Sequence, residues 1–344
     1  MSTQSVENAS PDAPQSRHRH QSVVIAIVNY CTADLTLDCL RSLSGQMIEY
    51  PGTTVVVADN ASPDSSGDVI ARAIEENNWS DWAQVLFLPR NGGFAFGNNA
   101  VIKKFLDKDD SPQFIWLLNS DTVVRPKALH ALLDFMEAHP NAGIAGSCLE
   151  DPDGTQQCST FRFHSIASEF ETSAKLGPVS RLLERFAVAP PITRVSGRYD
   201  WVSGASMLVR AQVFTQAGLL DERYFLYYEE TDFCSRAKDH GWECWFVGES
   251  RVIHLVGKSS GVTEREITTK RRSVYWFQSR RTYFMKHHGR LYAVGADLAL
   301  AMGTILWRFR TALSGRPSGL PQYFLYDLAR HSALLGKSIK DARK

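Results

Sequence analysis

The sequence predicts an α/β fold in which helices cover both faces of a mostly parallel β-sheet. Short apolar runs rich in β-branched residues alternate with stretches of helical spacing along the N-terminal part of the chain. This alternation is typical of parallel strands joined by crossover helices. With 344 residues, of which 44% are hydrophobic and 22% charged, the chain can also bury the core that such a sheet requires.

The apolar runs and helical stretches follow one another at short intervals. The expected strands of the N-terminal part lie at 22–30, 53–60, 83–90, 114–121 and 142–149, and the expected helices at 34–43, 62–77, 97–106 and 125–140. The second half predicts irregular chain at 161–198, strands at 200–210 and 244–254, and a helix at 229–242. From residue 264 onward the spacing is helical and basic.

These patterns divide the chain into three parts. Residues 1–21 predict a disordered polar tail, residues 22–262 hold the strand–helix alternation, and residues 263–344 form a helical C-terminal extension. The tail lacks the apolar core of a signal peptide, and the six cysteines are scattered without metal-ligand spacing. We therefore expect a protein of the reducing cytoplasm. The net charge of +1 argues against a nucleic-acid-binding protein, which would carry a clear basic excess.

The segment 291–307 of the extension raises the question of membrane contact. It is apolar over almost the length of a transmembrane helix, which needs roughly 20 apolar residues, but Asp297 lies inside it. A packed or interfacial helix and a true span both remain open. Basic residues precede it, and they suit either a peripheral contact with the cytoplasmic face of an anionic membrane or a solvated helix surface. These residues are Lys270, Arg271, Arg272, Arg280, Arg281 and Lys286.

Polar side chains follow four of the predicted strands at the point where each strand ends. They are Asn29, Asp59 with Asn60, Asn91, and the run Asn119-Ser120-Asp121. In doubly wound sheets, ligands bind outside the carboxyl ends of the strands. We therefore expect these side chains to line one cleft.

Asn119 and Asp121 are candidates for a metal site. Alternate residues at a strand end point the same way, so their amide and carboxylate oxygens can share one ion. Such ligands suit Mg²⁺ or Mn²⁺, although a type I turn explains the same residue types. A phosphate beside Asp59 and Asp121 would meet like charges, which repel by about 4 kcal/mol for a pair about 4 Å apart. A phosphate ligand is therefore expected together with a divalent cation.

The stretch RNGGFAFGNN follows the third strand. Gly92, Gly93 and Gly97 permit close backbone approach to a ligand, and Asn98 and Asn99 add hydrogen-bond donors near a helix start. The stretch lacks the GKS or GKT of a P-loop, and no GxGxxG follows the first strand. A nicotinamide dehydrogenase would explain the strand–helix alternation, but the missing glycine fingerprint counts against it.

An acidic cluster begins the helix predicted at 229–242. Glu229, Glu230 and Asp232 either stabilise the helix N-terminus, where the dipole favours carboxylates, or supply a general base. The aromatic run YFLYY before them makes a partly dry approach, in which a carboxylate keeps a raised pKa. His254 ends the last predicted strand, and it is either a structural residue or, with Lys258 of the following Gly/Ser segment, part of a phosphate site.

Seven motifs lie in order over roughly residues 22–260. They are VVIAIVNYCTADLTLDCLRSL, VVVADNASPDSS, PRNGGFAFGNN, WLLNSDT, DWVSGASMLVR, GLLDERYFLYYEETDFCSRAKDHGW and VIHLVGKSS. Together they resemble glycosyltransferase family 2, specifically its rhamnosyltransferase-like branch. Their number makes the resemblance specific for the family and much less specific for the sugar. The resemblance implies a GT-A fold for residues 22–262 and an inverting, metal-dependent transfer from a nucleotide-sugar.

The resemblance also implies a donor and metal site. Asn119-Ser120-Asp121 matches the DxD motif of the family with Asn at its first position, which leaves Asp121 as the charged metal ligand. His254 and Asn119 complete the implied Mg²⁺ or Mn²⁺ site, and Asp59 matches the residue that reads the nucleoside. The implied nucleotide-sugar contacts are Asn29, Asp59, Asn91, Gly93, Asn98, Asn119, Ser120, Asp200 and Trp201.

The resemblance assigns the general base to Glu230, with Glu229 and Asp232 in reserve. Asp200 and Trp201 match positions that line the sugar and acceptor pocket. The implied donor is dTDP-rhamnose, with a galactofuranose or hexose donor as the alternative. The implied acceptor is a polyprenyl-linked or growing cell-surface glycan. Because the DxD motif is altered, a non-catalytic nucleotide-sugar-binding relative stays open.

Overall fold

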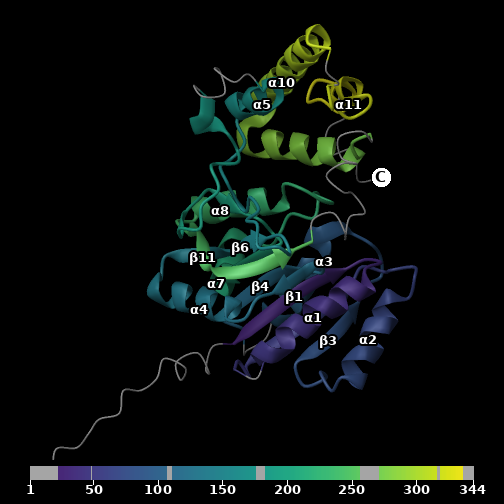
Figure 1. The fold of residues 1–344 in the computed structure, drawn as a ribbon, viewed down its shortest axis with the longest axis vertical. Helices are drawn as coiled ribbons and strands as arrows, with labels where there is room; N and C mark the ends of the chain where they lie inside the picture. Colours follow the sequence, from purple (N-terminus) through teal and green to yellow (C-terminus); the bar gives the residue numbers. More distant parts are fainter. Residues whose placement is uncertain are drawn as a thin grey trace, which may run out of the picture.

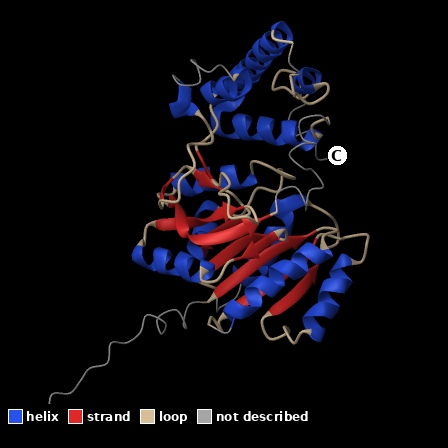
Figure 2. Cartoon of the chain, viewed as in Figure 1, coloured by secondary structure: helices blue, strands red, loops and turns tan. Residues whose placement is uncertain are grey.

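The computed structural model describes residues 22–47, 49–106, 111–175, 183–255, 271–315 and 318–335. It contains a sheet covered by helices and, beyond α8 (Glu229–Asp239), a further group of helices (Figures 1 and 2). The tail predicted for residues 1–21, the boundary predicted at 262, and the residues Lys258 and Lys270 lie outside the described residues.

The described part of the chain forms a nine-stranded sheet with the order β3-β2-β1-β4-β10-β6-β11-β5, and β8 pairs with β11. The strands are β1 (Val23–Asn29), β2 (Thr53–Asp59), β3 (Ala83–Phe87), β4 (Phe114–Asn119), β5 (Thr122–Val124), β6 (Ala142–Glu150), β8 (Gly197–Arg198), β10 (Ser206–Arg210) and β11 (Glu243–His254). The pairs β1–β2, β2–β3, β1–β4 and β6–β11 are parallel, as expected. β10 runs antiparallel between β4 and β6. A separate ribbon joins β7 (Thr160–Phe161) to β9 (Trp201–Val202).

Helices cover both faces of the sheet, which confirms the predicted fold class. One face carries α1 (Ala33–Met47), α2 (Ser66–Glu76) and α4 (Ala128–Ala138), and the other carries α3 (Gly93–Leu106), α7 (Ala211–Ala217) and α8. Successive side chains of a strand point to opposite faces. In β1, Ile25 and Ile27 therefore belong to the first core, and Val24 and Ala26 belong to the second. Burial on both faces explains why this strand is apolar throughout.

The third group of helices, which we call the helical region, consists of α5 (Ile166–Ala174), α10 (Val274–Leu313) and α11 (Phe324–Arg330). A short 3-10 helix, η3 (Glu184–Phe186), follows α5. The irregular chain predicted for 161–198 is wrong for α5, which begins with a capping box formed by Ser165 and Ser168. α10 breaks at Gly289, whose φ is 82°, so its two halves run in different directions (Figure 1).

The apolar segment 291–307 lies in the second half of α10. Among the described helices, α10 is long enough and apolar enough to cross a membrane, judged by length and composition only. However, Asp297 is buried and accepts hydrogen bonds from the Arg280 guanidinium and from the backbone nitrogen of Ala333. Arg280 also donates to Glu169 of α5 at 2.8 Å. Because these contacts pack the segment against protein, they favour the packed or interfacial interpretation over a true span.

Three of the basic residues singled out in the C-terminal extension form ion pairs with carboxylates of the protein. Arg280 is buried in the ion pairs just described, Lys286 pairs with Asp232 at 2.6 Å, and Arg271 pairs with Asp327 at 2.6 Å. The expectation that these basic residues form a membrane-facing or solvated surface is therefore wrong for Arg280, which is buried, whereas Arg271 and Lys286 stay partly exposed in their ion pairs. The physical reason is that each cation meets a carboxylate from an element that is distant in sequence.

Candidate active site

Asn29 is the centre of a buried hydrogen-bond network at the carboxyl end of β1. Its side-chain nitrogen donates to Asp59 Oδ1 at 2.7 Å and to Ser66 Oγ at 2.9 Å. Its side-chain oxygen accepts hydrogen bonds from the hydroxyls of Thr32 and Thr36, each at 3.0 Å. The network joins the ends of β1 and β2 to α1 and α2. Asn29 and Asp59 therefore form part of a preorganised floor.

Asp59 is almost fully buried in the same network. Ser62 donates to both of its oxygens, through the hydroxyl at 2.6 Å and through the backbone nitrogen at 3.1 Å. The neighbouring Asn60 donates to the backbone oxygen of Gly93 at 3.1 Å. Asn98 is also buried, and its side-chain nitrogen donates to a backbone oxygen within α3. These residues hold the strand ends and the start of α3 in place.

A pocket of about 150 Å³, which we call the strand-end pocket, opens at this edge of the sheet. The predicted site residues that line it are Asn91, Gly93, Asn119 and Ser120. The buried Asn29, Asp59 and Asn98 do not line it. The structure therefore divides the predicted nucleotide-sugar residues into a set that faces the pocket and a set that supports it.

Residues outside the predicted set complete the strand-end pocket. Tyr30 and Thr32 line it and lie within three residues of the end of β1, a signal that could have identified them from sequence. Asn60, which the sequence predicted for the cleft, lines the pocket as well. Phe225 and Leu226 also line it, but they come from the chain before α8. No short-range pattern connects that chain to the strand ends, so only the structure reveals this part of the lining.

Gly93 brings the start of α3 against the chain that precedes α8. Its φ is 85°, and a Cβ atom at this position would lie 2.0 Å from the backbone oxygen of Phe225. The backbone nitrogen of Phe94 donates to that same oxygen at 3.0 Å. Glycine permits both the conformation and the close approach. Gly93 thus positions the segment that crosses the pocket.

The predicted metal ligands Asp121 and His254 lie close together. His254 Nε2 is 3.6 Å from Asp121 Oδ1, since β11 pairs with β5 and sets His254 opposite Thr122. Across the described ranges, no group of three or more His, Cys, Asp or Glu side chains is arranged to hold a metal ion. A carboxylate and an imidazole, with the amide of Asn119, nevertheless fit Mg²⁺ or Mn²⁺, which keep waters and take substrate phosphates as further ligands.

The chain that leads into α8 separates the strand-end pocket from a larger cavity. Phe225 and Leu226 line the pocket, whereas Tyr227, Tyr228 and Glu230 line the cavity. Tyr227 and Tyr228 have φ values of 69° and 71°, a left-handed conformation that costs roughly 1–2 kcal/mol per residue. This strained turn directs Glu230, in the first turn of α8, toward the cavity.

The larger cavity, which we call the helical cavity, has a volume of about 480 Å³. Its walls come from β9 and α8 on one side and from α5, α10 and α11 of the helical region on the other. A Cβ atom at Gly204 would lie 3.4 Å from the ring of Phe94 and 3.8 Å from Cβ of Glu230. Gly204 therefore lies between a residue of the strand-end pocket and a carboxylate of the helical cavity.

Glu230 and Glu229 are in environments that favour the neutral acid. Burial raises the pKa of Glu230, whose Oε2 atom has no hydrogen-bond partner in the part of the chain that the structure describes. Burial and the charge of Glu230 raise the pKa of Glu229 well above its ordinary value. Glu229 does not line the helical cavity. A carboxyl group of raised pKa that faces a cavity suits a general base, so Glu230 has the better position.

Asp232, the other reserve candidate, is fully buried and has several partners. It accepts hydrogen bonds from the Tyr224 hydroxyl at 3.2 Å and from Arg236 Nε at 2.9 Å, and His287 Nε2 lies 2.8 Å away. Lys286 adds the ion pair described above. Burial opposes the charge of Asp232, but these partners outweigh burial and lower its pKa. Asp232 thus links α8 to α10.

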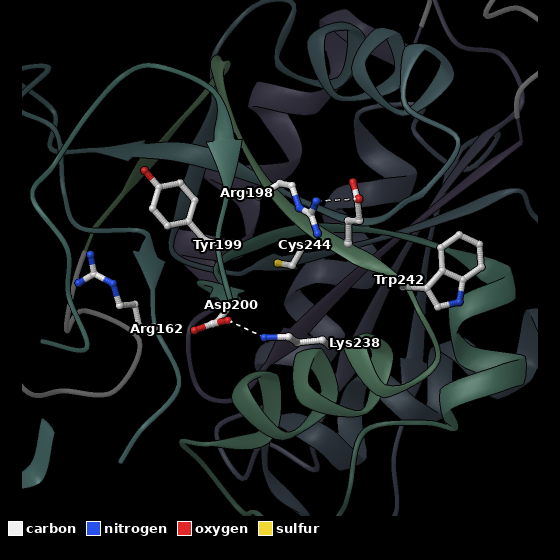
Figure 3. Close-up of a pocket in the computed structure, with 8 residues that line it drawn as sticks. Arg162, Arg198, Tyr199, Asp200, Lys238, Trp242 and Cys244 are labelled. Carbon is white, nitrogen blue, oxygen red and sulfur yellow. Dashed lines mark hydrogen bonds and ion pairs between the residues drawn. The ribbon is translucent and has the colours of Figure 1, made fainter. Parts of the chain in front are cut away.

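Asp200 and Trp201 are adjacent in sequence but face different cavities. Trp201 lines the helical cavity, and its indole nitrogen donates to the backbone oxygen of Arg162 at 3.0 Å. Asp200 lies in a separate pocket of about 330 Å³, where its side chain accepts from Lys238 at 3.0 Å (Figure 3). Neighbouring residues of an extended chain point in opposite directions. The structure therefore brings Trp201, and not Asp200, into the cavity of Glu230.

Comparison with known proteins finds related sequences. Residues 114–328 match the family model described as glycosyl transferase family group 2, and residues 22–187 match that of glycosyl transferase family 2. The N-acetylglucosaminyl-diphospho-decaprenol L-rhamnosyltransferase of Mycobacterium tuberculosis is 29% identical over 224 residues, which cover 60% of this chain and 68% of that protein. Rhamnosyltransferase WbbL of Escherichia coli is 25% identical over 166 residues, covering 47% of this chain and 60% of that protein.

Two solved structures share the fold at 14% sequence identity. The mannosyltransferase PcManGT from Pyrobaculum calidifontis, in complex with GDP-Man and Mn²⁺, superposes with a TM-score of 0.53. The match covers 96% of this chain and 90% of that protein. GalNAc-T7 with UDP, GalNAc and Mn²⁺ superposes with a TM-score of 0.52, and the match covers 90% of this chain and 54% of that protein. These similarities confirm the expected GT-A fold.

Proposed function

Because the chain belongs to glycosyltransferase family 2 and is a glycosyltransferase, we propose that it transfers L-rhamnose from dTDP-rhamnose, with inversion, to a hydroxyl group of a lipid-linked glycan. The rhamnosyltransferase names of several relatives support the donor. The Mycobacterium tuberculosis relative, whose name contains a diphospho-decaprenol, supports the acceptor class.

One observation carries this proposal: Glu230 lies where the strand-end pocket and the helical cavity approach each other. A transferase has to hold two substrates with their reacting atoms in contact, and this positioning lowers the barrier. The strand-end pocket lies at the edge of the sheet where nucleotides bind in α/β folds. We assign the donor to the strand-end pocket and the acceptor to the helical cavity.

Glu230 acts as the general base in this arrangement. Its carboxylate takes the proton of the acceptor hydroxyl while the hydroxyl oxygen forms a bond to the anomeric carbon of the donor. The bond from that carbon to the diphosphate breaks on the opposite face, so the configuration inverts and dTDP leaves. A positioned general base contributes typically 10²–10⁴-fold to the rate.

Asp121, His254 and Asn119 would hold the divalent ion, Mg²⁺ or Mn²⁺. When bound, the ion supplies positive charge that stabilises the leaving diphosphate. The Mn²⁺ complexes of the two structural neighbours support this cofactor. The donor's direct contacts are assigned to Asn91, Gly93, Asn119 and Ser120. The buried Asn29, Asp59 and Asn98 hold these contacts in position through their hydrogen bonds.

We assign the protein to the cytoplasmic face of a membrane, as a peripheral protein. The second half of α10 presents exposed apolar side chains at helical spacing, which are Leu298, Met302, Ile305, Phe309 and Leu313. Such a stripe suits a helix that lies in the membrane interface. With α10 in the membrane interface, the helical cavity would lie beside a lipid-linked acceptor.

A panel of nucleotide-sugars tests the donor. A ligand present at about 100 times its Kd stabilises the folded protein by about 2.7 kcal/mol, so binding is read from the melting temperature. We expect dTDP-rhamnose to raise the Tm in the presence of Mg²⁺ or Mn²⁺ and to have little effect without them. Stabilisation by dTDP-rhamnose without a divalent ion would contradict the metal site.

A hexose or galactofuranose donor is the second candidate. The hexosyltransferase Agl10 of Haloferax volcanii, 24% identical over 234 residues, favours it. Stabilisation by a UDP- or GDP-hexose, but not by dTDP-rhamnose, would replace the first candidate with this one. Donor binding without transfer to any glycan acceptor would instead support the non-catalytic relative.

A further inference from the structure

The helical cavity has aromatic and aliphatic walls. Trp201, Tyr227 and Tyr228 contribute from the sheet side, and Trp276 and Phe324 contribute from α10 and α11. Its volume of about 480 Å³ falls within the range of roughly 300–1,000 Å³ that small-molecule sites occupy. Apolar walls of this kind hold an apolar ligand through burial of its surface. The cavity therefore offers an apolar ligand walls from both of its sides.

Two basic residues, Lys175 and Arg272, lie on the cavity wall. Arg272 packs over the ring of Trp276, with its guanidinium carbon 4.4 Å from the ring centroid. Among the described residues it has no ion-pair partner, and burial lowers its pKa. Arg280 is enclosed as well, but the charges of Glu169 and Asp297 outweigh its burial and raise its pKa. The contrast identifies Arg272 as a charge available for an anionic ligand.

The carboxylates of the cavity do not neutralise Arg272. Glu169 also lines the cavity, but Arg280 donates to it at 2.8 Å and His164 lies 3.5 Å away. Glu230 is the other carboxylate on the wall, and burial raises its pKa. Arg272, which has no ion-pair partner among the described residues, and the proposed base therefore line the same cavity.

The second half of α10 separates this space from solvent. Leu300 and Thr304 are buried and line the cavity, whereas Leu298, Met302 and Ile305 of the same helix are exposed. One helix thus contributes both to the cavity wall and to the exposed apolar stripe. A ligand with a long apolar chain could leave the cavity along a surface that is already apolar.

From these observations we infer that the helical cavity binds the acceptor as an isoprenoid diphosphate, with Arg272 contacting the diphosphate and the aromatic walls contacting the first isoprene units. The inference rests on the proposed function, because it takes Glu230 as the base that faces the acceptor hydroxyl. It goes further by naming the residues that select a diphosphate-linked isoprenoid over a free glycan.

Farnesyl diphosphate, farnesol and inorganic diphosphate are the probes. Their binding to the full chain is measured by calorimetry without divalent cations, so that the strand-end pocket does not take up the diphosphate. We expect Arg272→Gln to weaken the binding of farnesyl diphosphate at least about tenfold, because a hydrogen bond between charged groups is lost. The affinity for farnesol, which carries no diphosphate, should stay unchanged. Leu320→Trp, which fills the cavity from a loop, is expected to weaken both isoprenoids.

Arg281→Gln is the matched control. Arg281 lies on α10, is half-buried and does not line the cavity, so its loss should leave farnesyl diphosphate binding unchanged. Equal affinity of wild type and Arg272→Gln for farnesyl diphosphate would overturn the inference. So would an affinity for inorganic diphosphate that matches that of farnesyl diphosphate, because the apolar walls would then contribute nothing.

A lipid headgroup is the other source of a phosphate. If vesicles of phosphatidylglycerol without isoprenoid bind the wild type, and Arg272→Gln abolishes that binding, Arg272 contacts the membrane and the acceptor assignment is wrong. The donor is measured separately, through Tm shifts with dTDP-rhamnose and Mg²⁺, which Arg272→Gln should retain. Failure of the wild type to bind any nucleotide-sugar would overturn the proposed function, whatever farnesyl diphosphate does.

Discussion

The strand-end pocket and the helical cavity lie on opposite sides of one short segment, but they are assembled in different ways. Polar residues that directly follow β1, β2 and β4 line the pocket, so each strand carries its own part of the site. The cavity instead collects side chains from β9, α8, α5, α10 and α11. The difference teaches that the strand ends, with the start of α3 and the chain before α8, form the donor site, whereas the acceptor side depends on docking of the helical region.

The largest expected effect comes from breaking that docking. Asp232→Asn should lower the free energy of unfolding by about 3–5 kcal/mol, because it removes the buried counter-charge of Arg236 and one of the two carboxylates that pair with Lys286. Urea denaturation measures the loss. Asp38→Asn is the control: Asp38 forms an exposed pair with Arg41, and such pairs contribute at most about 1 kcal/mol. Equal losses in the two variants would mean that the Asp232 network does not hold the helical region.

The pH dependence of the free energy of unfolding also tests the role of the Asp232 network. The folded-state pKa of Asp232 is lowered, so its contribution is present above the unfolded value of about 3.9 and is lost as the pH falls through the folded pKa. We expect the stability difference between wild type and Asp232→Asn to shrink below about pH 4. Denaturation curves between neutral and acid pH would show this, and a difference that stays constant would contradict it.

The next effect concerns Glu230, which lies between the strand-end pocket and the helical cavity. Glu230→Gln should lower turnover at least about a hundredfold, equivalent to about 2.7 kcal/mol in the barrier, because the acceptor proton loses its base. Nucleotide-sugar binding should persist, since Glu230 does not line the strand-end pocket. Transfer rates and Tm shifts with donor separate the two quantities. Normal turnover in this variant would remove the base assignment.

Glu229→Gln is the matched control for Glu230. Glu229 is buried, its pKa is raised well above the ordinary value by burial and by Glu230, and it lies outside the cavity lining. The substitution should therefore change turnover by less than about tenfold, well below the loss of a general base. In the wild type, the raised pKa of Glu230 should move the acid limb of kcat above the ordinary glutamate value of about 4.3.

A smaller effect is expected at the pocket itself. Gly93→Ala should destabilise the protein by about 1–3 kcal/mol, because a left-handed residue other than glycine is strained and its Cβ would meet the Phe225 oxygen. Donor affinity should fall while isoprenoid binding to the helical cavity is retained. In Gly45→Ala the new Cβ meets nothing within 4 Å inside α1, so this control should stabilise by about 0.5–1 kcal/mol.

The smallest effect on folding concerns the exposed stripe of α10. Replacing Met302 and Phe309 with Gln should change the free energy of unfolding by no more than about 0.5 kcal/mol each, since both are exposed. Binding to anionic lipid vesicles should nevertheless fall at least about tenfold, because each apolar side chain contributes roughly 1.5–3 kcal/mol when buried. Val69→Gln, on α2, is the control for cosedimentation. Unchanged vesicle binding in the double variant would exclude this stripe as the membrane contact.

Sequence reasoning predicted the sheet region well and the helical region poorly. The strands around Asn29, Asp59 and Asn119 were recognisable because burial on both faces produces continuous apolar runs. α5 was missed, since a short helix in a Pro-containing stretch has little periodicity of its own. The antiparallel β10 was not distinguished from a parallel strand, because its residues are buried in the same way.

The amino-acid pattern by itself determined the α/β class, the polar strand ends, the acidic start of α8 and the family. These signals are local, because a strand, its end and a helix start each span only a few consecutive residues. Tertiary structure decided that Asp232 is held by cations while Glu230 faces a cavity, that Asp200 and Trp201 separate, and that Arg272 keeps no counter-ion among the described residues. Such outcomes depend on which distant side chains pack together, and no pattern of neighbouring residues encodes those partners.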